Sequence, residues 1–301
     1  MLAISVVVNT FKRPNKLLDC VRAILKNNFK NFEIIIIEQQ GKGKLKEELK
    51  GLKNKNIFYF NLKKKGASLA KNFGIKRAKG EIIAFIDDDC KPARNWLINI
   101  YRGFQKNKET AAIFGRVRPY NPRRHKGLLC PCFFDRKEKG IITAPCRHWK
   151  KIGFGNNMVF RKDIFEKIGG FKEWLGPGSL ALAAEDAEIC YRLLSRGYKI
   201  LYDPQVLVYH DRWLKKDSFE WKKQMRFYQC GEMAAYGFYA FQGSRLAQEV
   251  VREHFRLTFR KVYFQFKKAI KNLSFRILCE AVLDSYYDLR GILIGFWFAK
   301  F

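Results

Sequence analysis

The sequence predicts an α/β protein with a mixed, mostly parallel β-sheet flanked by helices. Over residues 1–90, short β-branched runs alternate with segments of helical periodicity. Parallel strands need a crossover connection, usually a helix, so this alternation is typical of a parallel sheet. The runs are continuously apolar, which indicates strands covered on both faces. After about residue 211 the chain becomes aromatic, basic and helical.

The first half of the chain contains four expected strands and two expected helices. Pro14 begins the first helix, because proline at the first helical position gives up no intrahelical hydrogen bond. The second helix is expected over residues 67–78 and ends before Gly80. Its apolar face is expected to contain Leu69, Phe73 and Ile75. The strands are expected at residues 4–8, 32–37, 56–60 and 81–86.

Regular structure is expected to stop and then to resume in the second half. Residues 115–151 are rich in Pro, Arg, Cys and Gly, and we expect a long functional loop there. The elements expected after this loop are a strand at 156–160, a helix at 162–168, a helix at 185–196 and two short strands at 199–202 and 206–209.

Composition restricts the class of protein. The chain has 301 residues, of which 48% are hydrophobic, which excludes a disordered protein. Its net charge of +31 predicts attraction to a polyanion: nucleic acid, an anionic membrane or a phosphorylated substrate. The eight cysteines are scattered, which favours a reducing cytosol over a disulfide scaffold. No run reaches the ~20 apolar residues of a membrane span, and the N-terminus predicts a strand rather than a signal peptide.

An acidic triplet, Asp87-Asp88-Asp89, directly follows the strand expected at 81–86. Three adjacent carboxylates repel one another, and a divalent cation with oxygen ligands would compensate them. The alternative is a solvated turn before Pro92. Asn9, Thr10 and Glu38 also follow expected strands. Because ligands bind at the carboxyl ends of parallel strands, we expect one shared site there.

A second acidic pair, Glu185-Asp186, begins an expected helix. Acidic residues are favoured at helix N-termini by the helix dipole, so capping alone explains the pair. The functional alternative is that one of the two acts as a general base toward an acceptor hydroxyl. The occurrence of both acidic groups in one chain favours the functional interpretation.

Six segments occur in an order that resembles family 2 glycosyltransferases. They are SVVVNT (5–10), GASLAKNFG (66–74), FIDDD (85–89), GNNM (155–158), GGF (169–171) and Glu185-Asp186. The resemblance covers about residues 4–211 and implies a GT-A type, Rossmann-like fold. We therefore expect a catalytic domain at 1–211 and a basic helical region at 212–301. The catalytic domain would have a nucleotide-sugar-binding half at 1–110 and an acceptor half at 111–211.

The resemblance also implies an inverting transfer from a nucleotide-sugar donor. Asp186 would be the general base and Glu185 would orient the loop or the acceptor. Asp89 would be the direct ligand of Mn²⁺ or Mg²⁺, with Asp87 and His210 as further metal contacts. The donor would be contacted by Asn9, Thr10, Glu38, Asn72, Asp87 and Asp88. The acceptor would be a glycan, a lipid-linked sugar or a polysaccharide precursor.

Residues 209–213, Tyr-His-Asp-Arg-Trp, favour a single-addition enzyme, because processive relatives carry Gln-x-x-Arg-Trp and membrane spans. The alternatives are a nucleotidyltransferase and a basic nucleic-acid-binding protein. A nucleotidyltransferase would have a Gly-rich, Lys-containing loop after the first strand, whereas this chain has Asn-Thr-Phe-Lys-Arg-Pro at 9–14. No nucleic-acid-binding motif is recognisable, so we expect no nucleic-acid partner.

The basic C-terminal third has apolar residues at helical spacing, with Arg and Lys between them. These residues are Phe255, Phe259, Val262, Phe266 and Ile270. One interpretation is a helix that packs on the catalytic domain and exposes its own basic face to solvent. The other is a helix that lies in an anionic membrane interface, with residues 289–301 as a second such element. The second predicts a cytoplasmic protein held peripherally on the inner face of the cell membrane.

A zinc site is a further hypothesis. Cys130, Cys132, Cys146 and His148 carry ligand atoms that zinc prefers. The Cys-x-Cys spacing is tighter than in the usual structural zinc site, so buried or incidental cysteines are the alternative.

Overall fold

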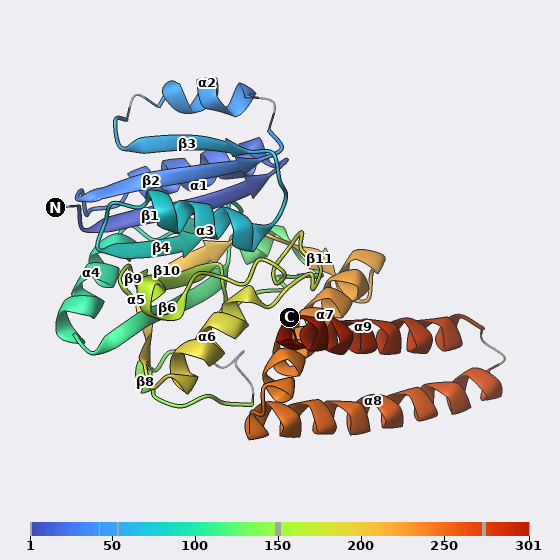
Figure 1. Ribbon diagram of the computed structural model, residues 1–301. Coiled ribbons are helices and arrows are strands. Elements are labelled where there is room, and N and C mark those ends of the chain that lie inside the picture. Colours follow the sequence, from blue (N-terminus) through green and yellow to red (C-terminus); the bar gives the residue numbers. More distant parts are fainter. Residues whose placement is uncertain (1, 42, 53, 148–151, 273–274, 301) are drawn as a thin grey trace. The chain divides into compact units, whose positions relative to one another are not determined.

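The computed structural model describes residues 2–41, 43–52, 54–147, 152–272 and 275–300 (Figure 1). The chain forms two compact units. The first comprises Met1–Glu173 and Glu185–Ser218, and the second comprises Trp174–Ala184 and Phe219–Phe301. Relative to the boundary expected at residue 211, the first unit extends to Ser218, and the short segment Trp174–Ala184 groups with the C-terminal helices.

Among the described residues, the first unit contains a nine-stranded sheet in the order β3-β2-β1-β4-β9-β6-β10-β5, with β8 paired to β10 (Figure 1). The four N-terminal strands are parallel: β1 (Ile4–Phe11), β2 (Phe32–Gln39), β3 (Ile57–Leu62) and β4 (Ile82–Ile86). The antiparallel strand β9 (Asn157–Arg161) joins β4 to β6 (Thr110–Pro119). The remaining strands are β10 (Lys199–His210), β5 (Cys90–Pro92) and β8 (Gly140–Ile142).

Helices cover the sheet as its sequence pattern predicted, so the expected α/β class is confirmed. Helix α1 begins at Pro14 and buries Leu17, Val21 and Ile24, which recur every three or four residues. The helices of this unit are α1 (Pro14–Leu25), α2 (Lys44–Lys50), α3 (Ala67–Arg77), α4 (Trp96–Lys106), α5 (Ile164–Ile168) and α6 (Glu185–Ser195).

The face that α3 buries differs from the expected one. Leu69, Phe73 and Ile75 are only half-buried, whereas Ala70 and Gly74 are buried. A Cβ at Gly74 would lie 2.5 Å from Cγ1 of Val7 on β1, so the helix backbone approaches the sheet closely there. Small residues allow this approach, and the larger apolar residues are displaced to the flanks.

The long loop expected at residues 115–151 begins later than expected. Strand β6 continues to Pro119 because Val117 is buried while Arg116 and Arg118 form ion pairs with Asp135. The segment then contains a short 3-10 helix (Pro122–Arg124), β7 (Leu128–Leu129), which pairs with β11 (Leu214–Lys215), and β8. Residues 148–151 lie outside the described part of the chain.

The two short strands expected at 199–202 and 206–209 form one strand, β10. Its pairing with β6 shifts register between Asp203 and Leu207, which is the interruption that the sequence pattern detected. The core of this unit lies between the sheet and its helices, and it includes the fully buried side chains of Val6, Ile34 and Ile36.

The second unit contains three long helices, α7 (Phe219–Phe241), α8 (Arg245–Lys271) and α9 (Phe275–Lys300). Helix α8 begins after Ser244, whose hydroxyl accepts a hydrogen bond from the backbone of Ala247 at 3.3 Å. The segment Trp174–Ala184 packs on them, since Trp174 stacks on Phe298 with 4.7 Å between ring centroids. In the described part of the chain, no helix combines the length and the apolar character needed to cross a membrane.

Candidate active site

The acidic triplet connects β4 to β5 at the carboxyl edge of the parallel strands. Strand β1 is the parallel neighbour of β4, and Thr10 near its end reaches the triplet. Its hydroxyl donates to Oδ2 of Asp88 at 2.5 Å. Asp88 is almost fully buried, and this burial raises its pKa to about 7 although Arg13 opposes the shift. The structure therefore brings the predicted donor residues Thr10 and Asp88 into contact.

Arg13 is a charged partner of the triplet that the sequence interpretation did not include. It precedes α1, and its guanidinium spans two carboxylates: Nη2 lies 2.7 Å from Oδ1 of Asp88, and Nη1 lies 2.6 Å from Oδ2 of Asp89. The sequence did contain a signal for this contact. Arg13 follows the first strand, so it had to lie at the same edge of the sheet as the acids. The guanidinium offsets part of the repulsion within the triplet.

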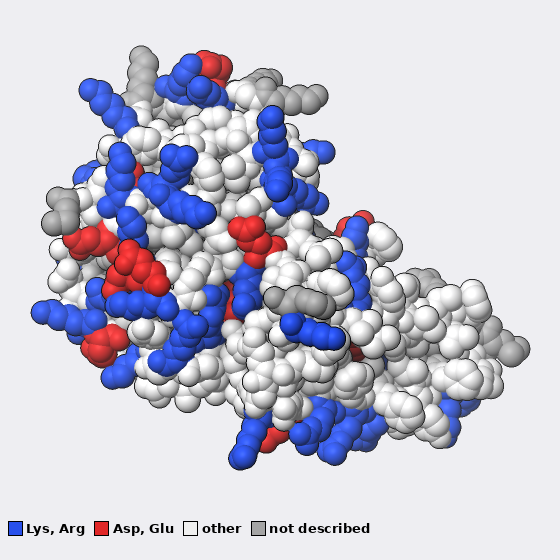
Figure 2. Space-filling view, viewed as in Figure 1, with Lys and Arg blue, Asp and Glu red and all other residues white. Residues whose placement is uncertain are grey.

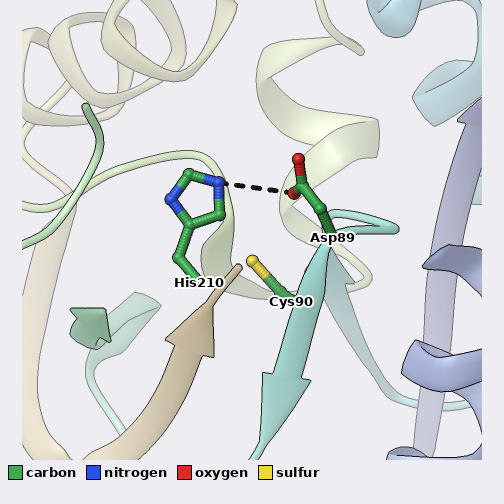
Figure 3. A group of neighbouring side chains, drawn as sticks. All are labelled: Asp89, Cys90 and His210. Carbon is green, nitrogen blue, oxygen red and sulfur yellow. Dashed lines mark ion pairs between the residues drawn. The ribbon is translucent and has the colours of Figure 1, made fainter. Parts of the chain in front are cut away.

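His210 and Asp89 face each other because β10 and β5 pair antiparallel, with His210 opposite Cys90. Figure 3 shows His210 at the end of β10, and Asp89 and Cys90 where β5 begins. Nε2 of His210 lies 3.4 Å from Oδ1 of Asp89. The other ring nitrogen, Nδ1, lies 3.0 Å from the carbonyl oxygen of Cys132, to which it can donate. This arrangement directs Nε2 toward the carboxylate, as in histidines that bind metals.

The pKa values of this pair are coupled by charge. Burial lowers the pKa of His210, but the neighbouring Asp89 outweighs it and raises the pKa to about 10. Burial also raises the pKa of Asp89, and His210 and Arg13 outweigh that effect, so the pKa of this carboxyl lies well below its usual value. Asp89 is therefore a carboxylate at neutral pH.

Asp89 and His210 fit a divalent cation. Oδ1 of Asp89 is buried without a hydrogen bond from any described residue. In the described residues, one group of at least three ligand-bearing side chains has its ligand atoms within 4.8 Å of one another, and it comprises Asp89, Cys90 and His210. Burial raises the pKa of the Cys90 thiol well above its usual value, so Cys90 is a neutral thiol. The carboxylate oxygens of Asp89 suit Mn²⁺ or Mg²⁺, whereas the imidazole nitrogen of His210 is a softer donor that favours a transition metal over Mg²⁺.

A buried ion pair lies between the triplet and the second acidic group. Nζ of Lys71, on α3, lies 2.6 Å from Oε1 of Glu185, and the lysine is 3% exposed. Burial lowers the pKa of Lys71, but the charges of Glu185, Asp87 and Asp186 outweigh it and raise the pKa. Burial raises the pKa of Asp87, and Lys71 opposes the shift. Lys71 thus interacts with acids that lie about a hundred residues apart in the sequence.

Asp186 begins α6 with its carboxylate held by backbone amides. The N–H of Gly155 donates to Oδ2 at 2.7 Å, and the N–H of Ala187 donates to Oδ1 at 2.9 Å. Burial and the charge of Glu185 raise the pKa of Asp186 to about 6, although Lys71 and the two amides oppose the shift. A Cβ at position 155 would lie 3.0 Å from Cβ of Asp186, so glycine leaves room for this side chain.

Glu38 ends its strand in a different set of contacts. The hydroxyl of Tyr59, on β3, donates to Oε2 of Glu38 at 2.5 Å. A Cβ at Gly41 would collide with the Glu38 carboxyl group, so the chain turns closely around it. The next residue, Gln39, accepts a hydrogen bond from the N–H of Gly66 at 2.6 Å. Asn9 is half-buried at the end of β1.

Asn72 holds another loop of the catalytic unit. Its Oδ1 accepts from the N–H of Phe171, and its Nδ2 donates to the carbonyl of the same residue, each at 2.8 Å. This two-way contact ties the GGF segment at 169–171 to α3. Among the described contacts, the Asn72 amide thus holds this loop, and its expected role at the donor site stays a prediction.

The proposed zinc ligands do not form one group among the described residues, and His148 lies outside them. Sγ of Cys130 instead lies 3.3 Å from Nδ1 of His210. Cys130 therefore contacts the histidine that faces Asp89.

The chain resembles known proteins in both sequence and fold. A family model described as Glycosyl transferase family 2 matches residues 5–169, which is more than half of the chain. The chain belongs to this family. It is a glycosyltransferase, and the enzyme class implied by the ordered motifs is confirmed.

One relative of this family 2 member is the glucosyl-dolichyl phosphate glucuronosyltransferase of Haloferax volcanii. It is 22% identical over 241 residues, which cover 76% of this chain and 75% of that protein. Other curated relatives are longer, and this chain spans about half of their length or less.

Two solved structures resemble this family 2 chain. The mannosyltransferase PcManGT from Pyrobaculum calidifontis, in complex with GDP-Man and Mn²⁺, has a TM-score of 0.60 at 13% identity, covering 95% of this chain and 86% of that one. S. aureus TarS 1–349, in complex with UDP-GlcNAc, has a TM-score of 0.59 at 14% identity, covering 99% and 90%. At these identities the likeness shows the fold alone, and it confirms the GT-A type.

Proposed function

We propose that this glycosyltransferase moves a sugar from a nucleoside-diphosphate sugar to an acceptor hydroxyl by one displacement with inversion. One observation carries the proposal: Lys71, buried between Asp87 and Glu185, couples the acidic triplet to the acidic pair at the start of α6. A donor diphosphate beside the triplet would thereby lie near the group that activates the acceptor.

Asp186 is the proposed general base. A pKa of about 6 leaves its carboxylate ionised at neutral pH and still basic enough to take a proton from a hydroxyl group. The N–H groups of Gly155 and Ala187 orient it. Glu185 is bound to Lys71 and serves as the positioning partner of this pair rather than as the base.

Asp89 and His210 are the proposed metal ligands, with Asp87 as a further contact. The buried Oδ1 of Asp89, which accepts no hydrogen bond from the described residues, and the direction of Nε2 of His210 toward it support this assignment. When bound, Mn²⁺ or Mg²⁺ supplies Lewis-acid neutralisation of the departing diphosphate. The relative solved with GDP-Man and Mn²⁺ uses the same fold.

The nucleotide end of the donor is proposed to contact Asn9, Thr10, Glu38 and Asp88, with Asn72 acting through the loop that it holds. Glu38 and Tyr59 form a polar pair at the end of β2, suited to the hydroxyl groups of a ribose or the edge of a base. The structural relatives bind GDP-Man and UDP-GlcNAc by their titles, so both nucleotides belong in the first donor panel.

The proposed acceptor is a glycan, a lipid-linked sugar or a polysaccharide precursor, to which single sugars are added. The name of the H. volcanii relative describes a sugar linked to dolichyl phosphate. We place this activity in the cytoplasm, on the inner face of the cell membrane, because a lipid-linked acceptor would be reached there by a strongly basic protein.

The test is binding and transfer with UDP-, GDP- and dTDP-sugars in the presence and absence of Mn²⁺. We expect one donor to bind only when Mn²⁺ is present. Asp89→Ala should lose this metal-dependent binding. Asp163→Ala is the matched control, since Asp163 is an exposed acid that pairs with Lys167. The proposal fails if no nucleotide sugar binds with Mn²⁺, or if Asp89→Ala binds it as the wild type does.

A further inference from the structure

The second unit buries a carboxylate among its three helices. Asp288 of α9 is 3% exposed and lies among polar side chains from the two neighbouring helices. Its carboxylate accepts from Nε2 of Gln229 on α7 at 2.5 Å and from the Thr258 hydroxyl on α8 at 2.9 Å. Nε2 of His254 lies 2.8 Å from the same carboxylate. One buried acid thus joins all three helices.

Two more acids of α9, both partly exposed, pair with cations of the neighbouring helices. Asp284 lies 2.8 Å from Nε of Arg226 on α7 and 2.6 Å from Nζ of Lys261 on α8. Glu280 lies 2.6 Å from Nζ of Lys222 on α7. The acids of α9 therefore recur every four residues along its inner face, and each is compensated by a cation or a polar group.

The outer face of α9 is apolar. Its exposed residues recur every three or four positions from Val282 to Trp297, and Phe275 lies seven residues before Val282 on the same face, so they form one stripe. They are Phe275, Val282, Tyr286, Leu289, Leu293 and Trp297.

The outer face of α8 has a matching stripe with cations beside it. Phe259 is 75% exposed, the largest value within this stripe. The residues of the stripe are Phe255, Phe259, Tyr263, Phe266 and Ile270, and those beside it are Arg256, Arg260, Lys267 and Lys271. Figure 2 shows the near surface of α8 and α9 as mostly uncharged, with Lys and Arg gathered along an edge of α8.

Small residues let α7 and α9 pack without using these apolar side chains. A Cβ at Gly291 would lie 2.3 Å from the carbonyl oxygen of Cys230, and one at Gly295 would lie 2.4 Å from that of Ala234. Backbone contact of this kind holds the helices together. Ile292 and Phe298 of α9 still pack inside the unit, whereas the large side chains of the stripe are left on the outside.

This unit buries apolar side chains such as Met233 and Ile292, as a water-soluble helical bundle does, but it also exposes two apolar stripes where such a bundle is polar. We propose that the outer faces of α8 and α9 bind an anionic lipid bilayer, lying in its interface with the aromatic and aliphatic side chains among the lipid tails. The flanking cations would contact phosphate headgroups, which makes the surface selective for negative charge. The helices lie along the membrane rather than across it, in keeping with their limited apolar length.

Charge favours a lipid surface over a second copy of the chain. Two copies meeting through α8 would bring Arg256, Arg260, Lys267 and Lys271 of each close to those of the other, and like charges repel. A nucleic acid would satisfy the cations but leaves the aliphatic residues of α9 without a suitable partner.

The test is flotation of the full chain with vesicles of phosphatidylcholine, alone or mixed with phosphatidylglycerol, without donor or metal. We expect binding to the mixed vesicles only, weakened by high salt. Replacing Arg256, Arg260, Lys267 and Lys271 by Gln should weaken it more than a hundredfold, since each charge contributes roughly fivefold. Phe266→Ser combined with Leu293→Ser should weaken it by at least about tenfold.

Matched controls lie in the first unit. Phe133→Ser changes a phenylalanine that is 52% exposed, compared with 49% for Phe266. Gln at Lys26, Lys46, Lys55 and Lys108, all exposed, removes the same number of charges. Both controls should bind mixed vesicles as the wild type does, and circular dichroism should show every variant folded.

Three results would overturn the proposal: no flotation with mixed vesicles, equal loss in the control variants, or a dimer in solution that Leu293→Ser dissociates while flotation is unchanged. Binding of RNA that matches vesicle binding and ignores the apolar substitutions would also overturn it, in favour of a purely electrostatic surface. Because the assay contains no nucleotide sugar, its outcome is independent of the donor and metal assignments.

Discussion

The two units of this chain both bury apolar side chains, but they differ in where acids and exposed apolar residues lie. In the first unit, Val6, Ile34 and Ile36 are buried between sheet and helices, and the acids gather at one edge of the sheet. In the second unit, Asp288 and Asp284 are inside, and Phe259 and Leu293 are outside. The first arrangement suits a folded catalyst in water. The second suits a surface whose exposed apolar side chains become buried when a partner binds.

The charged side chains of the two units also differ in what they pair with. Lys71 and Glu185 are paired within the proposed catalytic site, where we propose that their charges serve reactivity. The acids of α9 are bound by cations of α7 and α8 and link helices, so their charges serve packing. Substitutions in the first unit's site are therefore expected to change activity, and substitutions of the acids of α9 are expected to change stability.

The largest effect is expected at the proposed base. Asp186→Asn keeps the size of the side chain but removes its ability to accept a proton, so kcat should fall by roughly 10²–10⁴-fold. Donor affinity and the melting temperature should change little. Steady-state kinetics with the donor found in the panel would measure this, with Asp163→Asn as control. A kcat within a factor of two of the wild type would remove Asp186 from the chemistry.

The next largest effect separates the two interiors. Asp288→Ala leaves Gln229, His254 and Thr258 without their shared partner, and it should lower the free energy of unfolding by about 3 kcal/mol. Leu293→Ala, on the outer face of α9, should change it by less than about 0.5 kcal/mol. Urea unfolding followed by circular dichroism would compare them. If Leu293→Ala proved the more destabilising, the assignment of Leu293 to an unpacked outer face and of Asp288 to the interior would be refuted.

A pH dependence should report the groups around Asp186. The base works only when ionised and its pKa is about 6, so kcat should fall about tenfold for each pH unit below that value. Glu185 raises this pKa and Lys71 lowers it. Glu185→Gln should therefore move the acidic limb of the profile to lower pH, and Lys71→Met should move it to higher pH. If both substitutions moved the acidic limb in the same direction, this arrangement of charges around Asp186 would be contradicted.

A smaller effect is expected at Gly155. An added methyl group would lie 3.0 Å from Cβ of Asp186 and shift the carboxylate by a few tenths of an ångström. Gly155→Ala should lower kcat by about tenfold, because misplacement of a catalytic group is costly. Gly140→Ala is the control, since its new contact is the flexible end of Arg136. An unchanged kcat in Gly155→Ala would show that this close contact has no role in catalysis.

Much of the fold was readable because hydrophobic periodicity is local. Pro14 and the Leu17–Val21–Ile24 spacing located α1, and the continuous β-branched runs located β1, β2 and β4. The face of α3 was wrong because the closeness of Gly74 to Val7 depends on the sheet beneath it. The length of β6 was underestimated because Arg116 and Arg118 are stabilised by Asp135 across a loop.

The sequence by itself determined the α/β class, the family and the positions of the acidic groups at element ends, because these depend on residue order and on patterns within a few turns or strands. Only the tertiary structure decided that Arg13 binds the triplet, that Lys71 binds Glu185, and that α9 turns its acids inward. These contacts join residues far apart in the chain. Their partners are selected by burial and by the cost of leaving a buried charge uncompensated, and no local pattern records that cost.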